Sequence, residues 1–196
     1  FLKQMLRQDI EQGKGLCVLD PAGEFADYVL SVTPKERAED IIYFDPADIE
    51  RPIGLNMLEI DPSHPEQKTL VINELLGIFD KLYNLKETGG PVFEKYFKNS
   101  VLLLLDDYEN EIPTLADIPR VLTDDKFRAD KLSREQNPLI VQFWKQEAEK
   151  AGGEAALANI APYISTKVDT FISNEFLRPI INQQKSAFSF REAMDN

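Results

Sequence analysis

The chain has 196 residues, of which 43% are hydrophobic and 29% charged, so it can fold around a core and is not a disordered tail. Its one cysteine, Cys17, excludes an internal disulfide framework, and with His64 as the one histidine it cannot build a Cys/His zinc site. The chain has a net charge of −12, so it does not show the excess of basic residues that is typical of a DNA-binding surface. The longest apolar run, residues 101–105, is too short to span a bilayer, so we expect no membrane insertion by this chain.

Residues 1–60 show the pattern helix, strand, helix, strand. A helical apolar spacing over residues 1–12 is followed by a short apolar run at 16–19, which predicts a strand buried on both faces. Helical turns are expected between 24 and 40, and a second apolar run at 41–44 predicts a second strand. This order is typical of a βαβ unit with parallel strands. Two parallel strands cannot form a stable sheet alone, so we expect further strands outside this chain.

Residues 61–187 show helical signals only, and residues 188–196 look like a short return segment. The stretch after Pro91 is apolar on most sides, which predicts a helix at the centre of a bundle, and Trp144 is expected in the core. Several serine or threonine residues stand three positions before an acid or glutamine, a spacing that predicts helix starts. These pairs are Ser63 with Glu66, Thr114 with Asp117, Ser133 with Gln136 and Ser189 with Glu192. The fold expected is thus an α/β fragment followed by an all-helical domain, mainly helical overall.

The most informative stretch for chemistry follows the first predicted strand and runs from Asp20 to Glu24. In open α/β sheets, ligands bind outside the carboxyl ends of the strands, where Asp20 is expected to lie. Gly23 permits a tight turn, and Glu24 then starts a helix. Two carboxylates around such a turn could orient a magnesium-bound water or a nucleotide phosphate. The alternative is that Asp20 only stabilises a turn and that Glu24 only favours a helix N-terminus.

Other candidate residues give weaker signals. Asp45 ends the second predicted strand, where a turn is the simpler interpretation, although a place near a nucleotide stays open. The glycines at 13 and 15 follow a helix and precede a strand, so they cannot form a phosphate-binding P-loop, and no other stretch matches one. Cys17 is expected to be a small core residue. The acidic run 106–109 is expected to be a solvated helix end.

Residues 15–58 resemble the segment after the Walker A helix in HerA/FtsK-like motor ATPases, especially type IV secretion coupling proteins of the TraG/TraD type. In that family a strand ends in Asp-Pro-x-Gly-acid, matched here by the residues from Asp20 to Glu24. A second strand ends in Asp-Pro, matched by Asp45 and Pro46, and an Asn-x-Leu follows, matched by Asn56 and Leu58.

The resemblance implies that residues 1–60 are part of a RecA-like core, that residues 61–187 are its helical insertion, and that residues 188–196 lead back to it. Walker A would precede Phe1 and Walker B would follow Asn196. The whole motor would bind ATP and Mg²⁺ with help from Gly23 and Asp45, use Asp20 and Glu24 in catalysis, and move DNA. It would work as a ring, expected to be hexameric, in the cytoplasm or at the inner face of the membrane, with secretion or conjugation partners. This chain alone is expected to bind no cofactor.

Two other functions stay open on the sequence. Because two-thirds of the chain is predicted to be helical with an acidic surface, it could be a helical adaptor or protein-interaction module. A free-standing magnesium enzyme using Asp20 and Glu24 is the third possibility.

Overall fold

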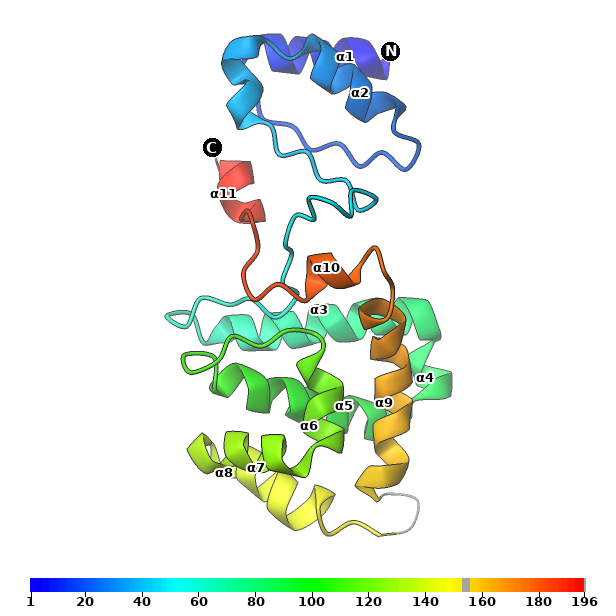
Figure 1. Ribbon diagram of the computed structural model, residues 1–196, viewed down its shortest axis with the longest axis vertical. Helices are drawn as coiled ribbons and strands as arrows, with labels where there is room; N and C mark the ends of the chain where they lie inside the picture. Colours follow the sequence, from blue (N-terminus) through cyan, green and yellow to red (C-terminus); the bar gives the residue numbers. More distant parts are fainter. Residues whose placement is uncertain (153–155, 196) are drawn as a thin grey trace. The chain divides into compact units, whose positions relative to one another are not determined.

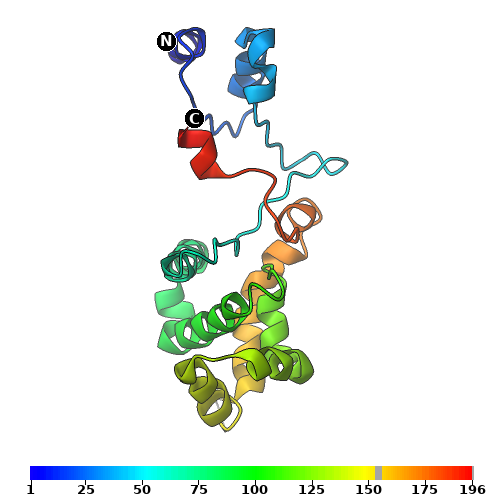
Figure 2. The ribbon, with the colours of Figure 1, turned by 90° about the vertical axis from the view of Figure 1, so that its left-hand side faces the viewer.

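The computed structural model describes residues 1–152 and 156–195, and the chain divides into two compact units (Figures 1 and 2). Unit 1 consists of residues 1–45 and 188–196, and unit 2 consists of residues 46–187. The chain therefore leaves unit 1 once and returns to it once. Residues 46–60, which the sequence pattern grouped with the first segment, belong to the helical unit 2.

Unit 1 contains three short α-helices and a 3₁₀ turn. These elements are α1 (Leu2–Glu11), α2 (Glu24–Val32), the turn Lys35–Asp40, and α11 (Phe190–Asp195). The guanidinium of Arg37 donates to the carbonyl of Ile10 at 3.0 Å and so ties the turn to the end of α1. Phe188 packs edge-on against Phe44, which joins the two chain segments of the unit.

The two strands predicted for unit 1 do not form, so the α/β expectation is not met. Residues 16–19 and 41–44 have no regular structure, and no strand occurs anywhere in the described ranges. A strand needs a neighbour that accepts its backbone hydrogen bonds, and these two runs do not form a ladder with each other. Their side chains are consequently open to solvent, with Leu19 91% and Tyr43 47% exposed.

Unit 2 is a helical bundle whose bounds largely follow the sequence pattern. Its elements are α3 (Glu66–Tyr83), α4 (Leu85–Thr88), α5 (Gly90–Asp106), α6 (Asp117–Thr123), α7 (Asp125–Arg134), α8 (Pro138–Gln142), a π-helical turn (Phe143–Ala148), α9 (Leu157–Ile172) and α10 (Arg178–Ile181). The chain as described is mainly helical, as the sequence predicted.

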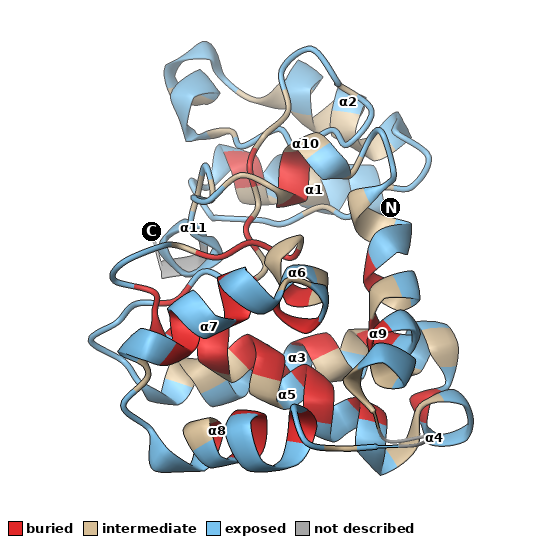
Figure 3. Cartoon of the chain, turned by 60° about the horizontal axis from the view of Figure 1, so that its bottom comes forward, coloured by how far each residue is buried: buried red, intermediate tan, exposed pale blue. Residues whose placement is uncertain are grey.

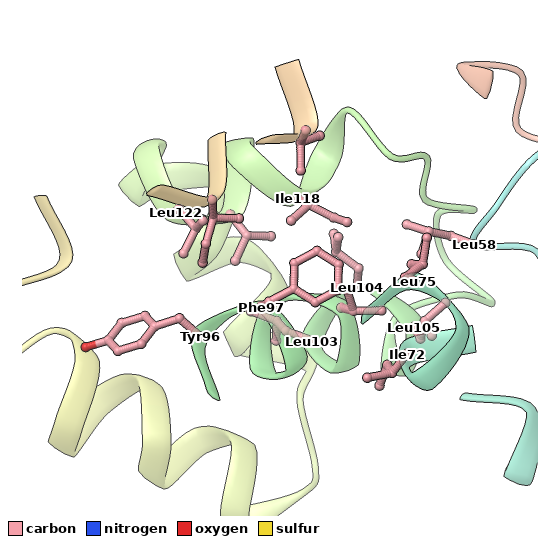
Figure 4. Close-up of a cluster of buried hydrophobic side chains, with 14 of the residues drawn as sticks. Leu58, Ile72, Leu75, Tyr96, Phe97, Leu103, Leu104, Leu105, Ile118 and Leu122 are labelled. Carbon is pink, nitrogen blue, oxygen red and sulfur yellow. The ribbon is translucent and has the colours of Figure 1, made fainter. Parts of the chain in front are cut away.

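Helix α5 lies at the centre of the bundle, which confirms the prediction from its apolar pattern. Phe97, Val101 and Leu104 are fully buried, and side chains of α3 and α6 pack around them (Figures 3 and 4). Phe79 of α3 meets the ring of Phe97 edge-on at 5.3 Å. Each such buried side chain stabilises the fold by about 1.5–3 kcal/mol through the surface it removes from water. Trp144 is also fully buried, as expected.

Candidate functional site

The turn from Asp20 to Glu24 is well formed, and its geometry assigns Asp20 a local task. One carboxylate oxygen of Asp20 accepts from the backbone N–H of Ala22 at 3.1 Å. The other accepts from Phe25 at 2.6 Å and from Ala26 at 3.1 Å. These N–H groups belong to the turn and to the first residues of α2, where the helix leaves its donors unpaired. Asp20 therefore caps α2 through its side chain.

The cap explains two further features, the backbone conformation of Gly23 and the lowered pKa of Asp20. Gly23 has φ of +84° in the left-handed region, which permits the carboxylate to reach past it to the helix start. The hydrogen bond from the N–H of Ala26, with those from Phe25 and Ala22, lowers the pKa of Asp20 and favours its ionised form. The tight turn that the sequence predicted is confirmed, while the catalytic role of Asp20 stays a prediction.

Glu24 and Asp45, unlike Asp20, are not part of this cap. Glu24 is the first residue of α2 and is exposed, so its carboxylate faces solvent next to the positive end of the helix dipole. Asp45 is also exposed and directly follows the second apolar run. Within the described ranges, no three His, Cys, Asp or Glu side chains gather closely enough to hold a metal ion.

The residues of this turn do not by themselves fit ATP with Mg²⁺. The N–H groups of Phe25 and Ala26, which could otherwise hold a phosphate at a helix N-terminus, already donate to Asp20. Both carboxylate oxygens of Asp20 are engaged in return. Glu24 is the one carboxylate of the turn that this cap does not use, so the turn offers a single acidic group to a nucleotide site completed elsewhere.

A second polar site lies where the chain enters and leaves unit 2, and sequence analysis identified only half of it. We call it the clamp, formed by residues 52–59 and 179–187, which run side by side (Figure 1). Asn56 is 95% buried, and its amide nitrogen donates to the carbonyls of Pro113 at 2.9 Å and Gln184 at 2.8 Å. Its amide oxygen accepts from the N–H of Leu58 at 2.9 Å. Both polar atoms of the buried amide thus have hydrogen-bond partners, as is usual for buried polar groups.

Further hydrogen bonds close the clamp across the two segments. The N–H of Leu55 donates to the carbonyl of Ile180 at 3.0 Å, and the N–H of Ala187 donates to the carbonyl of Gly54 at 2.9 Å. The N–H of Ser186 donates to the carboxylate of Glu59 at 2.8 Å. The Asn-x-Leu motif was visible in the sequence, but the partners of Asn56 lie 57, 128 and 130 residues further along the chain, and no local pattern indicates them.

A buried ion network lies between the end of α5 and α7, where the sequence pattern had indicated a solvated helix end. That interpretation of Asp107 is wrong, because its side chain is only 3% exposed and bonds Lys131 at 2.7 Å and Arg134 at 2.8 Å. Lys131, 1% exposed, also bonds Glu111 at 2.7 Å. Burial alone would raise the pKa of Asp107, but the hydrogen bonds from Arg134, Lys131 and Asn110 outweigh it and hold the pKa well below its usual range.

This network borders a polar hollow of about 430 Å³ that also contains Glu135 and Lys68. One carboxylate oxygen of Glu135 accepts from the N–H of Asn137 at 2.7 Å. The other is buried and has no hydrogen-bond partner among the described residues. Burial, with the charge of Asp106 nearby, raises the pKa of Glu135. Most charged groups that line the hollow form ion pairs with one another. We therefore interpret the hollow as a structural contact between the end of α5 and α7.

Comparisons with models of protein families, with curated proteins and with solved structures found no match to this chain. Among the described residues, no helix combines the length and apolarity that crossing a bilayer requires.

Proposed function

We propose that this chain is a segment of an ATP-driven DNA-translocating motor of the HerA/FtsK type, similar to type IV secretion coupling proteins. In this proposal unit 2 is the helical insertion and unit 1 is part of the RecA-like core. The observation that carries the proposal is topological. Unit 1 is built from two chain segments, and the whole helical unit is inserted between Asp45 and Phe188. The resemblance of residues 15–58 to the motor family implies the same arrangement from the sequence alone.

The surface of unit 1 supports the idea that it is incomplete without further strands. Ile10 is its only buried residue among those described, whereas the runs at 16–19 and 41–44 carry exposed apolar side chains. Parallel strands are stable inside larger sheets that bury both faces. Strands supplied by other parts of the motor would pair with these runs and cover their side chains. The partial RecA-like βαβ unit would then form in that context.

In the complete motor, the turn from Asp20 to Glu24 would lie at the nucleotide edge of the sheet. The cap made by Asp20 would fix the turn, with Gly23 allowing its tight bend. Glu24 would offer its carboxylate to the attacking water or to Mg²⁺, and Asp45 would lie at the end of the adjacent strand. ATP and Mg²⁺ are the cofactors of that complete motor, DNA is its substrate, and other subunits of a ring, expected to be hexameric, are its partners. The motor would work in the cytoplasm or at the inner face of the membrane, beside secretion or conjugation components.

The proposal is tested with a longer product of the same gene. We expect a G-x-x-x-x-G-K-[ST] sequence shortly before Phe1 and magnesium-dependent ATPase activity stimulated by DNA in the longer protein. Glu24→Gln should reduce its turnover while leaving the fold intact, because it removes charge and keeps shape. Asp27→Asn on the exposed face of the same helix is the matched control.

The same experiment has clear negative outcomes. If no P-loop sequence lies upstream, the motor proposal is wrong. If Glu24→Gln has wild-type turnover, the proposed role of Glu24 is wrong. Residues 1–196 alone should show no ATP binding by calorimetry, since the phosphate-gripping N–H groups and lysine of a P-loop are missing. They should also bind DNA weakly at physiological salt. Non-specific affinity comes from basic side chains that neutralise phosphates and release counterions from the DNA, and this chain has a net charge of −12.

A second candidate is a helical protein-interaction module. The observation that favours it is that unit 2 has its own core around α5 and its own closed clamp. This function would need neither nucleotide nor DNA. An ATPase-inactive longer protein that still captures a protein partner through residues 46–187 would favour this candidate over the motor.

A further inference from the structure

We propose that the groove between α6 and α9 of unit 2 binds a basic amphipathic helix of a partner protein. The groove is open to solvent, has a volume of about 640 Å³ and is lined largely by apolar surface. Its lining includes Leu122 of α6 and Ala161 of α9, which are 3% and 5% exposed. Helix α9 contributes small residues along the groove, including Ala158 and Ser165, so another helix can approach its backbone closely.

The lining of the groove on α9 is as long as a helix of a few turns. The part of α9 that lines it extends from Leu157 to Asp169, which is roughly 18 Å at the α-helical rise per residue. Helices α6 and α9 pack against each other within the bundle (Figure 3). A partner helix with apolar residues at positions i, i+3, i+4 and i+7 would fill such a groove with one face.

One polar side chain in the groove lining is available to a hydrogen-bond donor of a partner. The hydroxyl of Ser165 is buried and has no partner within the part of the chain that the structure describes. Pro162 lies inside α9 and has no N–H, so the carbonyl of Ala158 receives no intrahelical hydrogen bond from it. The Ser165 hydroxyl can accept from a lysine or arginine side chain. A buried acceptor without a donor is costly, and a cationic partner would supply the missing bond.

The charges around the groove select the same partner. Asp125 and Asp169 belong to its lining, one at the start of α7 and the other near the end of α9. The Asp125 side chain is 88% exposed although it contacts Arg128, and the guanidinium of Arg128 is itself committed to Asp125, Glu149 and the carbonyl of Val121. The Asp169 carboxylate forms no ion pair within the described ranges. The groove therefore attracts cations and repels nucleic acid and anionic membranes.

The test uses residues 1–196 and fluorescein-labelled peptides of about 14 residues, long enough for the groove. The first probe has leucines at one helical face and lysines flanking them. The second replaces every lysine with glutamate, and the third keeps the composition of the first but scrambles the leucine positions. We expect anisotropy to report salt-sensitive binding of the first probe only, because the groove needs both an apolar stripe and positive charge.

Two exposed substitutions locate the binding in the groove. Ala158→Phe fills the groove, so binding of the first probe should be lost, and Asp169→Lys should weaken it roughly tenfold by reversing one rim charge. Glu74→Lys, an identical charge change on the exposed face of α3, is the control and should have little effect.

The proposal is overturned by unchanged affinity in both Ala158→Phe and Asp169→Lys, by equal binding of the glutamate probe, or by no binding of the lysine probe. Self-association of the chain that Ala158→Phe abolishes would instead identify a second copy as the occupant and overturn the proposed partner. The assay contains neither ATP nor DNA, so its result is independent of the motor proposal.

Discussion

The ammonium group of Lys131 lies 2.7 Å from Oδ2 of Asp107, and both side chains are almost completely removed from water. The contact joins α7 to the residue that follows α5, the central helix of unit 2. Removing either partner would leave the other charge buried with one ion pair fewer, and a buried charge that loses a partner is costly. Arg134 and Glu111 complete the set, so the pair is the centre of a network rather than an isolated bridge.

Replacing Asp107 with asparagine should destabilise unit 2 by about 3 kcal/mol, because Lys131 would keep its burial and lose its buried partner. Chemical denaturation followed by circular dichroism measures the change. Asp130→Asn is the control, since Asp130 pairs with the same Arg134 but is 60% exposed. If both variants lose the same free energy of unfolding, the burial of Asp107 adds nothing to the stabilisation by its ion pairs.

Acid should remove the contribution of Asp107 in a defined range. Its pKa is lowered in the folded state, so its stabilisation is fully present above the unfolded pKa of about 3.9 and is lost as the pH falls below that value. The difference in unfolding free energy between wild type and Asp107→Asn should therefore be constant from pH 7 to 5 and shrink below about pH 4. A difference that disappears already near pH 6 would contradict this assignment.

Glu135→Gln should stabilise the protein slightly at neutral pH, by less than about 1 kcal/mol. The folded-state pKa of Glu135 is raised, so its ionisation destabilises the fold as the pH rises through that pKa. Glutamine keeps an acceptor for the N–H of Asn137 without the charge. Thermal unfolding at pH 4 and pH 7 should show the gain at pH 7 only. Glu94→Gln, at an exposed position of α5, should give no such gain.

Gly54→Ala should destabilise the clamp by about 1–3 kcal/mol. An added Cβ would lie 2.6 Å from the side-chain oxygen of Gln183 and 2.9 Å from the backbone carbonyl of Lys185, both closer than real contacts allow. Gly77→Ala in the middle of α3 meets nothing within 4 Å and should instead stabilise by about 0.5–1 kcal/mol. Thermal unfolding of the two variants should shift in opposite directions. An unfolding temperature of Gly54→Ala equal to or above that of the wild type would show that the clamp tolerates the extra atom.

Asp20→Ala should loosen the start of α2 while Glu24→Gln should not. The Asp20 carboxylate accepts from Ala22, Phe25 and Ala26, whereas the Glu24 side chain faces solvent. Hydrogen exchange measures this directly, because amides that lose an acceptor exchange faster. Faster exchange over residues 22–26 is expected in Asp20→Ala alone. Unchanged exchange in that variant would mean that the carboxylate does not cap the helix.

The helices were predictable because their information is local. The apolar pattern of α5 and the burial of Trp144 follow from side-chain spacing, and both predictions are confirmed. Local spacing also misleads. Ser133 was expected to start a helix, but α7 continues to Arg134, and the hydroxyl of Ser133 bonds the carbonyl of Asp130 inside it. The next helix is capped by Asn137 instead.

The features that sequence analysis missed depend on distant partners. The runs at 16–19 and 41–44 have the apolar character of strands, but a strand forms only beside another strand. Burial of Asp107 depends on Lys131, 24 residues further along the chain. At the candidate site, the turn around Gly23 was predictable from residue type, while the commitment of both Asp20 oxygens to backbone N–H groups could only be seen in three dimensions.

The bond between the carbonyl of Gly54 and the N–H of Ala187 places a residue near the start of the helical unit beside the last residue of that unit. Domains whose ends lie close together tolerate being inserted into a loop of another protein. We therefore expect residues 54–187 to accept insertion into a loop of an unrelated host protein, with little entropic cost of closing that loop. For the same reason, the two ends could be linked directly and new termini opened at an exposed loop of the bundle.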